Sequence, residues 1–111
     1  MITIPGHFIK AELCENWRCR PAHVAPIDCT VQAELDPNGE FGTDVGTAAI
    51  NGETFRMHYG QYSSGTRVVD GTNGSHSLTL FITRGLRKAI FEVRLSDGRY
   101  YWYTCGYGGG K

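Results

Sequence analysis

The chain has 111 residues, and its 11 basic and 11 acidic side chains cancel to a formal net charge of zero. Its length allows one domain and excludes a multidomain enzyme, and 41% hydrophobic residues exclude a disordered chain. No apolar stretch approaches the ~20 residues of a membrane-spanning helix, so we expect no membrane partner. The 15 glycines and 12% aromatic residues are typical of short strands and tight turns, and they exclude a helical bundle or coiled coil. We therefore expect a single domain over residues 1–111.

The N-terminal half contains one segment with a helical pattern and the first predicted strand. Residues 6–18 place Phe8, Ile9, Leu13 and Trp17 on one face of a helix, which makes this segment the candidate for a short helix. Residues 29–35 alternate apolar and polar side chains with the period of a half-buried strand. Asp36-Pro37-Asn38-Gly39 then predicts a turn.

The rest of the chain predicts strands joined by short turns. Asn51-Gly52 between residues 47–50 and 53–59 is typical of a hairpin. Further strands are expected over 66–70, 77–83, 89–95 and 99–105, the last two joined by Ser96-Asp97-Gly98. A helical turn or two over residues 83–92 is the weaker alternative. The expected fold class is all-β, mainly antiparallel, with seven or eight short strands in a sandwich or barrel and at most one short helix.

Charge is unevenly distributed along the neutral chain. Residues 21–55 have a net charge of −6, whereas residues 56–111 have a net charge of +5. One interpretation is that strand faces of opposite sign attract each other within the fold. The other is a basic surface that receives an anion, formed by Arg84, Arg87, Lys88, Arg94 and Arg99.

Four cysteines, Cys14, Cys19, Cys29 and Cys105, predict two disulfides and an oxidising compartment. Three pairings are open, and we favour Cys14–Cys29 with Cys19–Cys105, which closes a short N-terminal loop and ties the two ends of the chain together. With these disulfides and no signal peptide at the start, the numbered chain is expected to be a mature secreted form with an added Met.

A structural zinc ion is the rival interpretation. Cys14, Cys19, His23 and Cys29 supply four soft ligands within 16 residues. The first two cysteines are farther apart than in a zinc knuckle, and Pro21 and Pro26 restrict the loop. The preferred prediction therefore contains no metal and no other cofactor.

The densest aromatic run lies near the C-terminus. In a strand, Tyr100 and Trp102 share one face, while Tyr101 and Tyr103 share the other. An exposed Tyr100/Trp102 face with Arg94 and Arg99 nearby predicts a binding surface, since these residue types anchor interfaces. A central strand covered on both sides would also need large residues on both faces, so the core interpretation stays open.

Glu53, Arg67 and His76 form a candidate catalytic set. RNA cleavage by attack of the 2′-hydroxyl needs a general base, a general acid and a cation at the phosphate. The segments Glu53-Thr54-Phe55, Gly65-Thr66-Arg67-Val68-Val69 and His76-Ser77-Leu78 resemble those of small microbial ribonucleases over residues 53–81. That resemblance implies that Glu53 is the base, Arg67 the phosphate clamp and His76 the acid, and it makes an α+β ribonuclease-like fold the alternative. Glu53 falls on the inward Phe55/Met57 face of its strand.

Trp17-Arg18-Cys19 is also similar to the aromatic-x-Cys signature of ribonuclease-like secreted fungal effectors, which implies binding without catalysis. We therefore predict a small secreted, non-catalytic binding protein of virulence or defence effector type that recognises a host protein or glycan. The alternatives are a metal-independent endoribonuclease or RNA-binding relative, and an intracellular zinc-stabilised protein. The partner's identity and the oligomeric state are left open.

Overall fold

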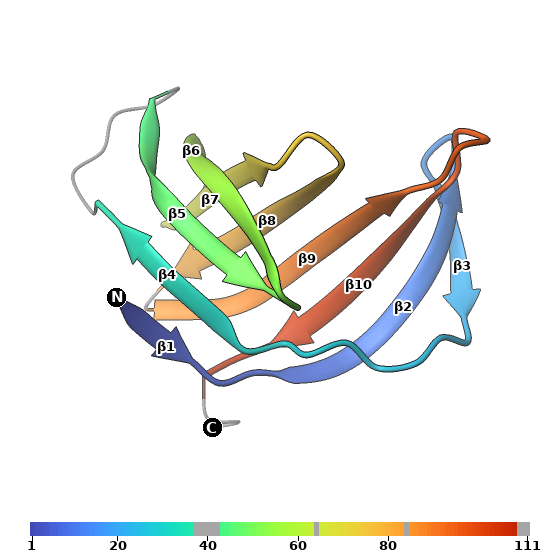
Figure 1. Cartoon of the computed structure of the whole chain (residues 1–111), viewed down its shortest axis with the longest axis horizontal. Coiled ribbons are helices and arrows are strands. Elements are labelled where there is room, and N and C mark those ends of the chain that lie inside the picture. The colour runs from blue at the N-terminus through green and yellow to red at the C-terminus, as the bar shows by residue number, and fades with distance from the viewer. Residues whose placement is uncertain (37–42, 64, 84, 109–111) are drawn as a thin grey trace.

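The computed structural model describes residues 1–36, 43–63, 65–83 and 85–108, and over these residues it is built from strands without a helix (Figure 1). The strands are β1 (Ile2–Ile4), β2 (His7–Glu15), β3 (Arg18–Ala22), β4 (Val31–Leu35), β5 (Asp44–Ile50), β6 (Glu53–Ser63), β7 (Thr66–Thr72), β8 (His76–Thr83), β9 (Gly85–Arg94) and β10 (Tyr100–Gly106). The predicted all-β fold is confirmed, and the α+β alternative is wrong for the described residues.

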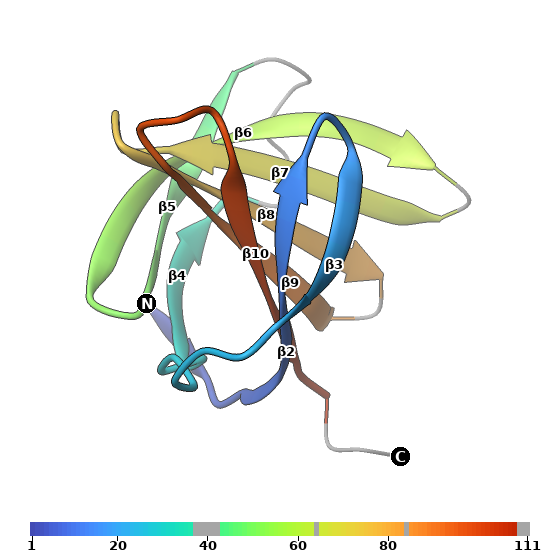
Figure 2. The same cartoon turned by 90° about the vertical axis from the view of Figure 1, so that its right-hand side faces the viewer.

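All ten strands belong to one antiparallel sheet in the order β1-β4-β5-β6-β7-β8-β9-β10-β2-β3. The strands from β4 to β10 form a meander, so each pairs with its neighbour in sequence. β1 pairs with β4 and β2 pairs with β10, although only Pro5 and Gly6 separate β1 from β2. This connection requires the sheet to curl until its two ends approach each other, as the wrapped strands in Figures 1 and 2 show. The architecture is therefore a single rolled sheet rather than two separate stacked sheets.

The predicted hairpins follow from local turn chemistry. Asn51 and Gly52 have φ values of 52° and 77°, the positive values that a two-residue hairpin turn requires. The Ser96-Asp97-Gly98 turn is closed by a hydrogen bond of 2.8 Å from the Leu95 N–H to the Arg99 carbonyl. Residues 37–39 of the other predicted turn lie outside the described residues.

Neither candidate helix is present in the described residues, which agrees with the expectation of at most one short helix. Residues 6–18 contribute β2, and the part of 83–92 that the structure describes lies in β8 and β9. A helix would bury Ile9 and Trp17 together with Leu13, yet Ile9 is 52% and Trp17 is 84% exposed. The reason is β10, which has β2 on one side and β9 on the other, so that ladder hydrogen bonds to β10 hold both segments extended.

The core lies on the inner face of the rolled sheet. Its largest fully buried side chains include Phe55, Phe91, Met57, Leu78 and Leu80, which occupy alternating positions of β6, β8 and β9. Phe55 and Phe91 meet edge to face with ring centroids 5.6 Å apart. Each such side chain contributes roughly 1.5–3 kcal/mol through removal of apolar surface from water.

The predicted disulfide pairing is wrong, although all four cysteines are in disulfides. The bonds are Cys14–Cys19 and Cys29–Cys105. Cys14 and Cys19 lie directly opposite each other in the β2–β3 register, which brings their Cβ atoms within reach. Cys29 precedes β4, and its Cα lies 5.8 Å from that of Cys105 in β10, because the rolled sheet brings these regions together.

These bonds overturn the zinc interpretation, since Cys14, Cys19 and Cys29 have no thiol left to coordinate a metal. Two disulfides are compatible with an extracellular protein. In the described part of the chain, no helix has the length and apolar character needed to cross a lipid bilayer.

Gly6, Cys29 and Tyr107 contact one another where the β1–β2 connection crosses the end of β10. The Tyr107 hydroxyl donates a buried hydrogen bond of 2.6 Å to the Cys29 carbonyl. A Cβ on Gly6 would lie 2.2 Å from the Tyr107 ring and 2.8 Å from the same carbonyl, so only glycine fits at this crossing. Burial, and to a lesser extent the charge of Asp28, raise the pKa of Tyr107.

Candidate binding site

The outer face of β9 and β10 carries three of the four predicted binding residues, Tyr100, Trp102 and Arg94, in two neighbouring cross-strand pairs. Trp102 lies opposite Glu92, and Tyr100 lies opposite Arg94. The Tyr100 and Trp102 rings are half-buried, with centroids 5.7 Å apart. The two aromatic side chains therefore form one partly exposed apolar surface.

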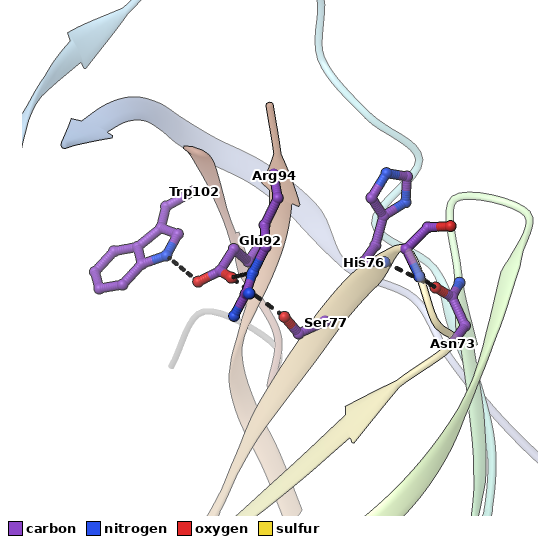
Figure 3. A network of polar contacts seen from close by, with 7 residues as sticks. Asn73, His76, Ser77, Glu92, Arg94 and Trp102 are labelled. Carbon is purple, nitrogen blue, oxygen red and sulfur yellow. Dashed lines mark hydrogen bonds and ion pairs between the residues drawn. The ribbon is translucent and has the colours of Figure 1, made fainter. Parts of the chain in front are cut away.

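Glu92 organises the polar half of this face (Figure 3). Its carboxylate accepts hydrogen bonds from Trp102 Nε1 at 3.0 Å, Arg94 Nε at 2.9 Å and Ser77 Oγ at 3.3 Å. Burial alone would raise the pKa of Glu92, but these hydrogen bonds and the Arg94 charge outweigh it and hold the pKa below its ordinary value of 4.5. The ionised carboxylate thus fixes the Trp102 indole and the Arg94 guanidinium in place.

A groove of about 510 Å³ lies beside this face, between the turns of the β2–β3 and β9–β10 hairpins. Both turns lie at the same end of the molecule (Figures 1 and 2). The groove is lined by Asn16, Trp17, Glu92, Arg94, Leu95, Ser96, Gly98, Arg99 and Tyr100. Three of the four predicted binding residues, Arg94, Arg99 and Tyr100, therefore line the groove. The fourth, Trp102, donates a hydrogen bond to Glu92, which also lines it.

The groove also contains Trp17, which is not among the four predicted binding residues. The helical pattern of residues 6–18 predicts Trp17 on one face of a helix, yet Trp17 lies at the tip of the β2–β3 hairpin. Asn16 and Trp17 form the turn, Glu15 pairs with Arg18, and Cys14 pairs with Cys19 at the next position. The five-residue separation of the two cysteines therefore fits a disulfide across a hairpin. This spacing is the feature of the sequence that could have predicted the hairpin and the position of Trp17 at its tip.

Arg99 bridges this groove and a second groove of about 590 Å³ that is also lined by Arg18 and Arg20. Its guanidinium pairs with Asp97 at 2.7 Å, and the hydrogen bond lowers the pKa of Asp97 and raises that of Arg99. This ion pair is exposed on one hairpin turn.

The predicted basic surface is not one cluster. Arg87 and Arg94 are both on β9, seven positions or about 23 Å apart along the strand. Lys88 follows Arg87 and lies 5.9 Å from the Phe81 ring, away from the groove. Arg84 lies outside the described residues.

The structure brings together two of the three candidate catalytic residues, Glu53 and His76. His76 Nδ1 lies 2.5 Å from Glu53 Oε1, and the Asn73 amide donates to the same oxygen at 3.0 Å. Asn73 Oδ1 accepts the backbone N–H of His76 at 2.9 Å, which holds the turn before β8 (Figure 3). The His76 ring also meets Phe91 edge to face at 5.7 Å. A histidine oriented by a carboxylate can transfer protons.

Arg67 does not join this pair. It pairs with Ile82, six positions or about 20 Å beyond His76 along β8. The arginine that lines the small pocket beside His76 is Arg94 instead, together with Thr72, Gly74, Ser75 and Ser77. The three residues implied by the ribonuclease resemblance therefore do not form one catalytic centre.

Comparisons with protein-family models, with curated proteins and with solved structures found no match to this chain. Two features of the structure bear on function, namely the groove lined by Trp17 and Tyr100 and the Glu53–His76 pair. Of these two, the groove brings together more of the predicted site residues.

Proposed function

We propose that the protein is a small secreted, non-catalytic binding protein of virulence or defence effector type. It recognises a host protein or glycan through the surface formed by Tyr100, Trp102, Arg94 and Arg99. The observation that carries this proposal is the Glu92 network, which holds Trp102 and Arg94 in place beside a groove. Aromatic and arginine side chains held in this way anchor interfaces at small cost in conformational entropy.

The two disulfides support the secreted part of the proposal. Oxidised cysteine pairs persist outside the reducing cytosol, and they stabilise small domains whose cores are limited. A small scaffold tied in this way presents a rigid surface to a partner.

The test is a panel of glycans and peptides, followed by calorimetric titration of the tightest ligand. Tyr100→Ala and Arg94→Ala are expected to weaken that ligand about tenfold each, as interface anchors do. Arg87→Ala is the matched control, because it removes an exposed arginine from the same strand outside the groove. A ligand that binds both groove variants as tightly as wild type would contradict the proposal.

A second candidate function, metal-independent RNA cleavage, is favoured by the Glu53–His76 contact alone. It predicts cleavage of single-stranded RNA that His76→Gln abolishes. His58→Gln is the control, because His58 makes a comparable contact of 2.7 Å with Asp44 on the exposed surface. Intact RNA after incubation with wild type, or equal loss in both variants, would exclude this candidate.

A further inference from the structure

The turn that carries Trp17 has an unusual backbone for its residue type. Asn16 and Trp17 are the two central residues between Glu15 and Arg18, which pair across β2 and β3. Their φ values are 52° and 67°, both in the left-handed region. Hairpin turns of this kind favour Asn followed by Gly, and a bulky residue at the second position is strained by its Cβ.

Burial does not compensate for this strain, because the Trp17 side chain is 84% exposed. The Cys14–Cys19 disulfide lies one residue beyond the Glu15–Arg18 pair and ties the strands together behind the turn. The cross-link restrains the backbone that carries the indole, so little backbone freedom is lost when Trp17 contacts a partner. Backbone strain at such a position points to a contact role.

Trp17 and Tyr100 supply two aromatic residues to the same groove, whose 510 Å³ volume falls in the range of small-molecule sites. Charged side chains that line this groove and its neighbour are Arg18, Arg20, Arg94, Arg99, Glu15 and Glu92. Glu92 pairs with Arg94 and Asp97 pairs with Arg99. Arg18 and Arg20, set against Glu15, therefore leave the two grooves with a net charge of +1. The combined surface therefore suits an anion that also has flat apolar faces.

We infer that Trp17 is a contact residue of the binding site and that the groove takes an oligosaccharide containing uronic acids. A pyranose ring presents a face of C–H groups that packs on an aromatic ring, and its carboxylate pairs with a guanidinium through two parallel hydrogen bonds. An acidic peptide supplies carboxylates without a series of flat rings, so the aromatic residues favour the sugar. This inference rests on the proposed function and specifies its ligand.

The test is calorimetric titration of tetragalacturonate into the full chain. We expect saturable binding to wild type, and at least about tenfold weaker binding of the methyl-esterified tetramer, which keeps the rings and removes the charge. Trp17→Ala is expected to weaken tetragalacturonate about tenfold, with partial recovery in Trp17→Phe. Ile9→Ala is the matched control, since it removes a large exposed apolar side chain outside the groove.

Trp17→Gly accompanies Trp17→Ala, because glycine accepts the observed φ and keeps the test valid if the alanine variant unfolds. No binding of tetragalacturonate, unchanged affinity in Trp17→Gly, or equally tight binding of tetraglutamate would overturn the inference. If Tyr100→Ala weakens another ligand while tetragalacturonate does not bind, the inference fails and the proposed function stands. If every ligand binds Tyr100→Ala and Trp17→Gly as tightly as wild type, the inference and the proposed function are both wrong.

Discussion

Removal of each disulfide separately should destabilise the fold by different amounts, since the two bonds close loops of very different length. Cys29 and Cys105 are 76 positions apart, whereas Cys14 and Cys19 are 5 apart. With chain entropy alone, the long crosslink contributes about 4.5 kcal/mol to the free energy of unfolding and the short one about 2 kcal/mol. The double variant Cys29→Ala/Cys105→Ala should therefore be the less stable by about 2.5 kcal/mol.

Urea unfolding followed by tryptophan fluorescence measures both free energies, with the wild type as reference. Cys14→Ala/Cys19→Ala should remain folded, because the short crosslink contributes the smaller free energy. It should bind the groove ligand more weakly, because this crosslink holds the turn that carries Trp17. Peptide mapping of the unreduced wild type provides an independent check of the pairing. A larger loss from Cys14→Ala/Cys19→Ala than from the other pair, or a peptide joining Cys19 to Cys105, would refute the reasoning.

Three further predictions concern Tyr107, Glu92 and Trp17. Because the folded-state pKa of Tyr107 is raised above its ordinary 10.0, only the unfolded chain releases this proton just above that pH, so stability should fall as pH rises through 10.0. Urea midpoints on either side should show a smaller fall in Tyr107→Phe, which itself loses about 1 kcal/mol with the buried hydrogen bond. Because the folded-state pKa of Glu92 is lowered, its carboxylate contributes stability above pH 4.5, and this stability is lost as the pH falls through the folded-state pKa. The free energy of unfolding should therefore fall less with decreasing pH in Glu92→Gln than in wild type. Trp17→Gly should be more stable than Trp17→Ala by about 1 kcal/mol in thermal or urea unfolding, since only alanine keeps a Cβ in the left-handed region; equal stabilities would contradict the strain argument.

The parts of the fold that local chemistry determines could be predicted from the sequence. Asn51-Gly52 between two strands predicts a turn, and the inward positions of Phe55 and Met57 follow from the period-two alternation of a strand. Residues 6–18 could not be assigned in this way. Their extended conformation depends on pairing with β10, as in the Leu13–Tyr101 pair, which is distant in sequence.

The candidate site shows the same division. Glu53 and His76 begin β6 and β8, and alternate strands of an antiparallel meander begin at the same end. Arg67 lies near the start of β7, which is at the opposite end, so the observed meander separates it from Glu53 and His76. The groove could not be predicted from the sequence, because it forms only when the rolled sheet brings the β2–β3 and β9–β10 turns together.

The chain has two tryptophans, which makes their indole N–H signals in a ¹H–¹⁵N correlation spectrum a direct report on the proposed surface. The measurement is a titration of isotopically labelled protein with the tightest ligand from the panel. We predict saturable shifts of the Trp102 indole and of the Tyr100 and Arg94 backbone amides at one common affinity. Saturable binding that leaves all three signals in place and moves those of another region would contradict the central claim.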